Sequence, residues 1–300
     1  MTIIYMLVNV LIFILLAPLF EGVIRKITAK VQSRQGPPVT QPYFDILKLL
    51  GKENIDSAGT WTFRIAPVLA LSSILTVVAI IPFGYQANFL TQYADVISVI
   101  YLLTFGGVSV LLGALSSRNT YALVGASREM ITMIMVEPVL AMLFIIGAVK
   151  VKTLGITAAI GSVSSSGYGI SVIIMIIVYL MALQAFVGRQ PFDIPEAEIE
   201  ILEGPYIEYS GPNYAMFKYY CMIKQMFYAA LFVMVFNPIA TTGYYAADIL
   251  IQLCGMFLVY IVIALVGSTN PRFRIDQAIK YYAVLIILSL GAISLSAYGM

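Results

Sequence analysis

Long stretches that lack any charged side chain are the feature that most constrains how this 300-residue chain can fold. An α-helix needs about 20 predominantly apolar residues to cross the hydrocarbon core of a bilayer. The chain holds seven uncharged runs of that length or more, and an eighth segment, 130–149, is interrupted only by Glu137. We therefore predict an all-α integral membrane protein, folded as a single polytopic membrane domain over residues 1–300. Its eight transmembrane helices are expected near residues 2–24, 64–83, 95–116, 130–149, 169–188, 218–237, 246–267 and 279–299.

The composition excludes several classes of protein. Charged residues make up 11% of the chain, whereas a soluble domain needs about 25% to cover its surface. No basic cluster interleaved with aromatic residues indicates a nucleic-acid partner. The chain has no histidine and only two cysteines, Cys221 and Cys254, so a zinc site, a cysteine-ligated iron–sulfur cluster or a histidine-ligated haem is not expected. We predict no metal site, no cofactor and no catalytic residue within this chain.

The distribution of basic residues predicts the orientation in the membrane. Fifteen of the 17 lysine and arginine residues fall in loops that follow odd-numbered spans, and only Lys150 and Lys152 fall on the other side. Basic loops stay on the cytoplasmic side, so both termini are expected outside. The predicted cytoplasmic loops, where partner subunits would dock, are 25–63, 117–129, 189–217 and 268–279. The small-residue stretch 162–169 is expected to be a flexible outer turn.

The first cytoplasmic loop contains a predicted interfacial helix. Gly36-Pro37-Pro38 forms a turn, because proline removes a backbone donor and restricts the residue before it. A short helix is expected to begin at Pro42 and to end at Gly51, with Asp45 and Lys48 spaced to form a pair. Its apolar side would carry Phe44, Leu47 and Leu50. The turn and helix together would form a shaped platform for another subunit.

The loop between the fifth and sixth spans is unusually acidic. Its carboxylic acids are Asp193, Glu196, Glu198, Glu200, Glu203 and Glu208. A helix beginning at Pro195 and ending at Gly204 would place Glu196, Glu200 and Glu203 on one face, where like charges repel. Three outcomes follow from such crowding: cationic partners, raised pKa values with shared protons, or exposure to water. The interleaved apolar residues favour contact with protein, which would raise the pKa values of these acids towards the range of proton transfer.

One acid lies near the middle of a predicted span. Glu137 is eight residues after Glu129, hence about 12 Å deeper along a helix. Ionisable groups inside a membrane normally face protein or a water cavity, so we predict a role in a proton path. A neutral acid hydrogen-bonded between helices is the structural alternative. Glu21, near the end of the first span, is a weaker candidate, and Asp95 and Asp248 are expected to be solvated at outer helix ends.

The last cytoplasmic loop carries Arg272, Arg274 and Asp276 close to the start of the final span. By itself, this is typical of a basic anchor on the cytoplasmic side. The two arginines could equally supply counter-charges for the acidic loop.

Five motifs carry a resemblance to a known family. The chain resembles the family that includes the H (ND1-type) subunit of respiratory complex I, formate hydrogenlyase subunit 4 and the anchors of membrane-bound [NiFe] hydrogenases. The resemblance covers nearly the whole chain. Its motifs are Arg34-x-Gly36-Pro37 with Gln41-Pro42-x-x-Asp45-x-x-Lys48-Leu49, Gly125-Ala126-Ser127-Arg128-Glu129 with Glu137-Pro138, Pro191-Phe192-Asp193-x-Pro195-Glu196-Ala197-Glu198, Glu208-Tyr209-Ser210-Gly211 and Arg272-x-Arg274-x-Asp276.

Two departures separate this chain from quinone-reducing members of that family. Those members carry a longer insertion after the first Gly-Pro, whereas here Pro38-Val39-Thr40 leads directly into Gln41. The pattern from Leu202 to Gly211 is similar to that of the hydrogenase branch. The resemblance therefore implies partner subunits that hold the iron–sulfur clusters and a [NiFe] or related site, with antiporter-like membrane subunits alongside. It also implies ferredoxin or formate as the indirect electron donor, and a prokaryotic cell membrane with its lipid as the location.

Together these features predict a membrane anchor that couples electron transfer in docked subunits to H⁺ or Na⁺ translocation. The alternatives are a quinone-binding H subunit, the anchor of a sulfur-reducing complex and, from another class, a stand-alone ion transporter. The predicted coupling residues are Glu21, Glu129, Glu137, Asp193, Glu196, Glu198, Glu200, Glu203 and Glu208. The predicted docking residues are Arg34, Gly36, Pro37, Gln41, Asp45, Lys48, Arg272, Arg274 and Asp276.

Overall fold

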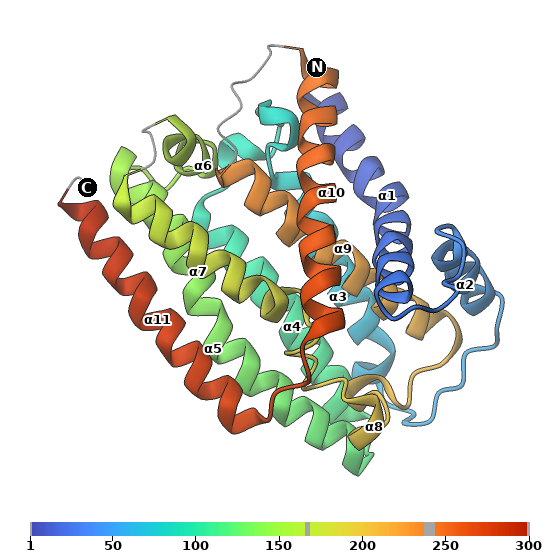
Figure 1. Cartoon of the computed structure of the whole chain (residues 1–300). Coiled ribbons are helices and arrows are strands. Elements are labelled where there is room, and N and C mark those ends of the chain that lie inside the picture. The colour runs from blue at the N-terminus through green and yellow to red at the C-terminus, as the bar shows by residue number, and fades with distance from the viewer. Residues whose placement is uncertain (1, 166–168, 237–243, 299–300) are drawn as a thin grey trace.

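Eight long apolar helices form the body of the protein in a computed structural model, which describes residues 2–165, 169–236 and 244–298 (Figure 1). The prediction of eight membrane-spanning helices is therefore confirmed for this part of the chain. These helices are α1 (Thr2–Val31), α3 (Trp61–Ile80), α4 (Val96–Ser116), α5 (Thr120–Val151), α7 (Ile170–Val187), α9 (Gly211–Phe236), α10 (Tyr245–Thr269) and α11 (Ile275–Ala297). Two of the predicted spans end at residues 237 and 299, which lie outside the described residues.

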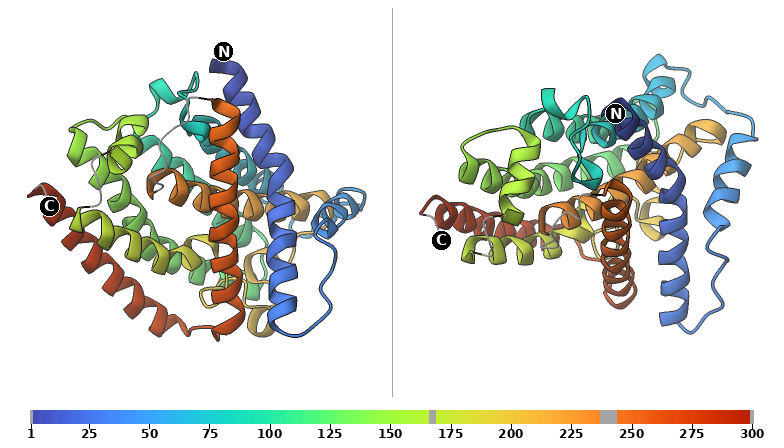
Figure 2. Two further views of the ribbon diagram at one scale, coloured as in Figure 1. Left: turned by 45° about the horizontal axis from the view of Figure 1, so that its top comes forward. Right: turned by 90° about the horizontal axis from the view of Figure 1, so that it is seen from above.

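Helix α9 is the core of the bundle. It runs through the middle of the molecule in both views of Figure 2 and packs against α1, α3, α7 and α10. Of the 18 most apolar consecutive residues of α9, 78% are buried, compared with 28% for the corresponding residues of α1 and of α11. The outer helices consequently expose rows of large aliphatic side chains, such as Leu7, Leu11 and Leu15 on α1. Such surfaces are typical of contact with lipid or with other membrane subunits.

Short helices connect the spans. Helix α2 (Gln41–Leu50) begins and ends within a residue of the predicted positions, and Phe44, Leu47 and Leu50 form its exposed apolar side. The expected flexible turn over 162–169 is partly helical instead, because α6 (Ile156–Ser165) continues into it; residues 166–168 lie outside the described part. The remaining short elements are α8 (Glu198–Ile201), η1 (Phe83–Tyr85), η2 (Thr91–Tyr93) and η3 (Gly204–Tyr206).

Several helices extend beyond the predicted spans. Helix α5 has 32 residues, a length of about 48 Å, which exceeds a hydrocarbon core of about 30 Å. Residues 120–129, predicted as part of a cytoplasmic loop, are in fact the first turns of α5, and Glu129 lies on this helix. Counting uncharged residues placed the start too late, because a helix can carry charges such as Arg128 once it leaves the apolar core.

Proline-induced gaps in two helices are filled by tyrosine hydroxyls. Pro18 in α1 and Pro67 in α3 have no N–H, so the carbonyls of Ile14 and Phe63, four residues earlier, lack their helical donor. The hydroxyl of Tyr219 donates to the Ile14 carbonyl, and that of Tyr209 donates to the Phe63 carbonyl at 3.1 Å. A helix inside a membrane needs such substitutes because lipid offers no hydrogen bonds.

Both ends of the chain lie on the side of the bundle opposite α8 (Figure 1), as an even number of spans requires. That this side faces the outside stays a prediction from the lysine and arginine distribution. Asp95 is exposed as expected, but Asp248 is buried at 2% exposure, so the prediction that it is solvated is wrong. The reason is that α10 packs against η1, where Gln252, one turn after Asp248, accepts a hydrogen bond from the Gly84 amide at 2.8 Å.

Candidate functional site

The acidic loop after α7 is held against α5 by close backbone contacts. A Cβ atom on Gly125 would lie 2.7 Å from Cδ of Pro205 and 2.8 Å from Cα of Gly204. Gly204 has a positive φ of 48°, and a Cβ there would lie 2.2 Å from the Pro195 carbonyl oxygen. Glycine at both positions lets the loop fold back on itself and on the helix. The Gly125 motif seen in the sequence therefore positions the acidic loop.

The predicted helix from Pro195 to Gly204 is wrong. Helix α8 covers only Glu198–Ile201, because Leu202 and Glu203 adopt left-handed backbone conformations with φ of 50° and 68°. The three glutamates expected on one face consequently lie in different surroundings, and only Glu200 and Glu203 have a partner among the described residues. Glu200 pairs with Arg128 at 2.8 Å on the exposed side, and Glu203 accepts a hydrogen bond from the Tyr214 hydroxyl at 2.7 Å.

A charged cavity, called here the central cavity, lies between this loop, α1 and α9. It has a volume of about 280 Å³. The apolar lining typical of small-molecule sites is largely absent here, since charged groups dominate the wall. The charged lining residues are Glu21, Arg25, Arg189, Asp193, Glu196, Glu198, Glu203 and Lys218.

Glu21 is the most buried of these acids, and two guanidinium groups compensate its charge. Arg189 forms an ion pair with one carboxylate oxygen, and Arg25 pairs with the other at 3.3 Å. Arg25 also binds Asp45 at 2.8 Å, so this network joins α1, α2 and the acidic loop. The sequence did not single out Arg189. The sequence feature that could have identified Arg189 is its position, as the one basic residue between the apolar run of α7 and the acids that follow.

Asp193 is paired with Arg272 at 2.8 Å, which confirms for Arg272 the alternative that the last cytoplasmic loop supplies counter-charge; Arg274 forms no ion pair with the described residues. The backbone supports this contact, because the amide of Phe273 donates to the Pro191 carbonyl at 3.0 Å. Burial raises the pKa of Asp193, and the adjacent Arg272 guanidinium opposes that rise.

Glu196 differs from its neighbours. It is half-buried and forms no hydrogen bond or ion pair with the residues that the structure describes. Burial, and then the nearby charge of Asp193, raise the pKa of Glu196 to about 7. A carboxyl group with such a pKa can gain or lose a proton close to neutral pH.

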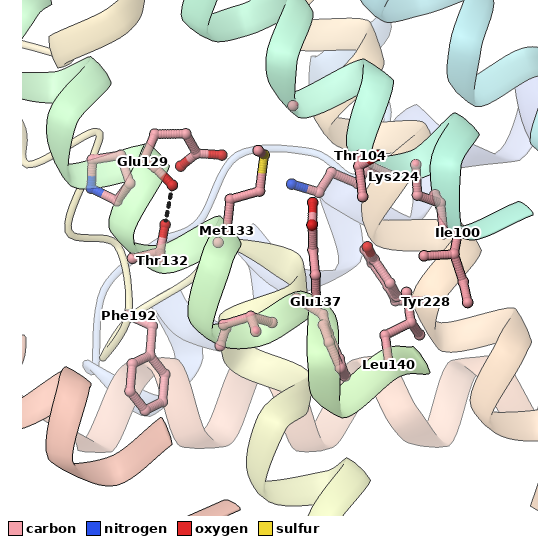
Figure 3. A pocket seen from close by; sticks show the side chains of 17 residues that line it. Ile100, Thr104, Glu129, Thr132, Met133, Glu137, Leu140, Phe192, Lys224 and Tyr228 are labelled. Atoms are coloured by element: carbon pink, nitrogen blue, oxygen red, sulfur yellow. Dashed lines mark hydrogen bonds between the residues drawn. The ribbon is translucent and has the colours of Figure 1, made fainter. Parts of the chain in front are cut away.

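Two smaller cavities continue from Glu196 into the membrane. The intermediate cavity, of about 40 Å³, is bordered by Glu196, Glu129 and Lys224. The membrane cavity, of about 70 Å³, is bordered by Glu129, Lys224 and Glu137, with Tyr228 beside them. In Figure 3 the amine of Lys224 points towards the carboxylate of Glu137, and Glu129 lies eight residues, or about 12 Å, before Glu137 on α5. Each cavity thus shares at least one ionisable side chain with the next.

Lys224 was missed as a site residue because the sequence placed it at the edge of a span. Helix α9 begins at Gly211, which puts Lys224 13 residues, or about 20 Å, along the helix. The longer helix could have been predicted from the proline-free stretch that begins at Asn213, which contains Lys218 and Lys224 among apolar residues.

The other predicted residues lie outside this chain of cavities. Glu208 accepts a hydrogen bond from Asn119, the N-cap of α5, at 2.6 Å. Asp45 binds Arg25 and accepts from Gln41 at 3.1 Å, and its expected pair with Lys48 does not form because the carboxylate turns towards α1.

The remaining docking candidates lie at the surface or in the α1–α2 turn. Gly36 packs on α1, where an added Cβ would lie 2.7 Å from that of Ala29. The exposed candidates are Arg34, Pro37, Lys48, Arg274 and Asp276. Their role as docking residues stays a prediction.

The chain belongs to the NADH dehydrogenase family, which it matches over residues 3–297. It is a multi-pass membrane protein of the prokaryotic cell membrane. The chain is 30% identical to formate hydrogenlyase subunit 4 of Escherichia coli over 285 residues, covering 92% of each chain. It is also 30% identical to hydrogenase-4 component C of the same organism, covering 91% of this chain and 89% of the relative.

Further likeness connects the chain to quinone- and sulfur-reducing assemblies. It is 30% identical to the H subunit of the NADH-quinone oxidoreductase of Bacillus cytotoxicus, covering 96% of this chain and 91% of that relative. Its fold matches a chain in the structure of the membrane-bound sulfane sulfur reductase, an archaeal respiratory membrane complex. That match has a TM-score of 0.86 and 28% identity, and it covers 98% of both chains.

Proposed function

We propose that this protein is the membrane anchor and coupling subunit of a hydrogenase-type respiratory complex related to complex I. Its similarity along nearly the full length of formate hydrogenlyase subunit 4 and hydrogenase-4 component C supports this assignment. The anchor would link electron transfer in docked subunits to translocation of H⁺ or Na⁺ across the membrane. The match to a chain of the sulfane sulfur reductase supports a second variant of this role equally well, namely the anchor of a sulfur-reducing complex.

The observation that carries the coupling role is the sharing of ionisable residues between successive cavities. Glu196 borders both the central and the intermediate cavity, and Glu129 and Lys224 border both the intermediate and the membrane cavity. A change of charge in a docked subunit would alter the protonation of Glu196. The proton would then pass by way of Glu129 to Glu137, with the Lys224 ammonium stabilising each carboxylate as it ionises.

The partners follow from this role. Iron–sulfur clusters and a [NiFe] or related centre would be held by hydrogenase-like large and small subunits on the cytoplasmic face, with ferredoxin or formate as the indirect donor. Antiporter-like subunits would lie beside the anchor in the membrane. The exposed residues Arg34, Arg274 and Asp276 would contact the docked subunits.

Binding of a quinone in the central cavity is less favoured. A quinone ring needs an apolar slot with few polar groups, whereas eight charged side chains line this cavity. The short connection from Pro38 to Gln41 is consistent with this preference.

The coupling role is tested by Glu137→Gln in the assembled complex, reconstituted into proteoliposomes. We expect ion translocation to fall at least tenfold while electron transfer in the docked subunits continues, because glutamine cannot carry the proton. Glu200 was grouped with the coupling residues from the sequence, but it is exposed and lines none of the three cavities in the described structure, so the proposed path leaves it out. Glu200→Gln is therefore the matched control. Equal translocation in the two variants would contradict the proposal.

A further inference from the structure

A second charged pocket lies beside the central cavity, between α1, α2 and α9. It has a volume of about 270 Å³, enough for a group much larger than a single water. Its ionisable lining consists of Arg25, Lys48, Lys52 and Lys218, with Asp45 as the one acid, and Tyr214 forms part of its wall. This volume is called the α2 pocket below.

Three of the four cations in the α2 pocket lack an acidic partner. Arg25 is balanced by Glu21 and Asp45. Lys48, Lys52 and Lys218 form no ion pair with any residue that the structure describes, and the amine of Lys218 lies 5.3 Å from the ring centre of Tyr214. Like charges gathered around one volume repel one another, and an anion between them would remove that repulsion.

The position of α2 indicates where this anion comes from. The helix lies outside the bundle beside α1 (Figure 1), and its apolar residues Phe44, Leu47 and Leu50 are 61%, 63% and 50% exposed. A helix with such a face lies in the membrane interface, at the depth of the lipid headgroups. Lysine ammonium groups bind phosphate as point charges, and basic pockets between transmembrane helices bind anionic headgroups.

We propose that the α2 pocket binds the phosphate group of an anionic membrane lipid. The phosphate would contact Lys48, Lys52 and Lys218, and the acyl chains would extend from the pocket into the bilayer. Because Arg25, Tyr214 and Lys218 border both this pocket and the central cavity, the headgroup would stand at the side entrance of the central cavity. This site does not depend on the proposed coupling role, since phosphate binding by Lys48, Lys52 and Lys218 requires no proton transfer between the carboxylates.

The test is lipid binding by the intact complex in mild detergent, followed by native mass spectrometry. Dioleoylphosphatidylglycerol, dioleoylphosphatidylcholine and inorganic phosphate are titrated separately. The pocket variant is Lys48→Gln with Lys52→Gln. The control is Lys26→Gln with Lys30→Gln, which removes the same charge from exposed lysines that lie outside every cavity described above. Lys218→Gln is a second, independent pocket variant.

We expect one tightly held phosphatidylglycerol in the unaltered complex and in the control. Its affinity should fall roughly tenfold in each pocket variant, because lysines near a headgroup contribute strongly to anionic lipid binding. An equal loss in the pocket and control variants would overturn the proposal in favour of diffuse attraction. Unchanged affinity in both pocket variants would also overturn it. Lysine-dependent binding of inorganic phosphate without retained lipid would overturn the lipid as the source.

Discussion

Glu196 and Lys224 border the same cavity, although Glu196 belongs to the loop after α7 and Lys224 lies near the middle of α9. This relationship joins a cytoplasmic loop to the interior of the membrane. Without Lys224, the step from the acidic loop to Glu137 would bring carboxylates together with no compensating charge. The positive charge of Lys224 therefore lowers the electrostatic cost of ionising several acids along one path.

The stability of the protein should depend on the ionisation of Glu196. The pKa of this group in the folded state is about 7, above the value of about 4.5 for a free glutamate. Between these values the folded state binds a proton that the unfolded chain has lost, so stability falls as pH rises. We expect Glu196→Gln to raise the thermal midpoint relative to the unaltered protein by an amount that grows from pH 4.5 to pH 7 and then levels off, because glutamine stays neutral.

The measurement is a thermal unfolding series in detergent across that pH range. Glu200→Gln serves as the control, because the Arg128 guanidinium lowers the pKa of Glu200 and removes it from this window. A pH-independent difference between Glu196→Gln and the unaltered protein would show that Glu196 is fully solvated.

Removing one member of the Glu21–Arg189 pair should destabilise the fold. Arg189→Gln leaves a buried carboxylate with Arg25 as its remaining partner. Breaking a buried pair costs about 3–5 kcal/mol, and we expect the lower end because Arg25 stays. Adding Glu21→Gln should restore most of the loss, since no uncompensated charge then remains. A double-mutant cycle of unfolding free energies measures this, and additive effects would argue against the pairing.

Much of the fold could be predicted from the sequence, because a bilayer allows few alternatives. Seven uncharged runs and one segment interrupted only by Glu137 located the eight spans, and Pro42 and Gly51 marked the limits of α2 closely. Helix ends beyond the hydrocarbon core were not predicted, since water lets a helix either continue or stop there. The early start of α5 at Thr120 is the clearest case.

The site was predicted in composition but not in arrangement. The acids Glu129, Glu137 and Glu196 were identified from charge and membrane depth, and the counter-charge of Arg272 followed from the basic last loop. The separation of Glu196, Glu200 and Glu203 was not predicted, because it depends on the left-handed backbone conformation of Leu202 and Glu203. Leucine and glutamate seldom adopt a left-handed backbone conformation, so the sequence does not predict it at these positions.

The contact at Gly125 should not tolerate a side chain. Gly125→Ala places a methyl group within 2.7 Å of the Pro205 ring, which must move together with the acidic loop. Overpacking of this kind costs about 1–3 kcal/mol. Gly291→Ala is the matched control, because an added Cβ at Gly291 would meet no atom within 4 Å. Thermal unfolding of both variants is the measurement, and equal midpoints would disprove the close packing.

The tyrosine that replaces the missing donor of Pro18 should matter only while that proline is present. Tyr219→Phe removes the hydrogen bond to the Ile14 carbonyl and should cost about 0.6–1.7 kcal/mol, as measured for such bonds in membranes. In a Pro18→Ala background, the alanine amide can donate to that carbonyl, so the cost of Tyr219→Phe should shrink. Unfolding in mixed detergent micelles provides the four free energies, and an unchanged cost in both backgrounds would refute the compensation.

The proposed coupling role depends most on a change in the protonation of Glu196 during turnover. Redox-induced infrared difference spectra of the assembled complex measure this directly, because a protonated carboxyl group has its own C=O stretching band. We predict a difference band that is lost in Glu196→Gln and kept in Glu200→Gln. A band that persists unchanged in Glu196→Gln would contradict the coupling role of the cavity chain.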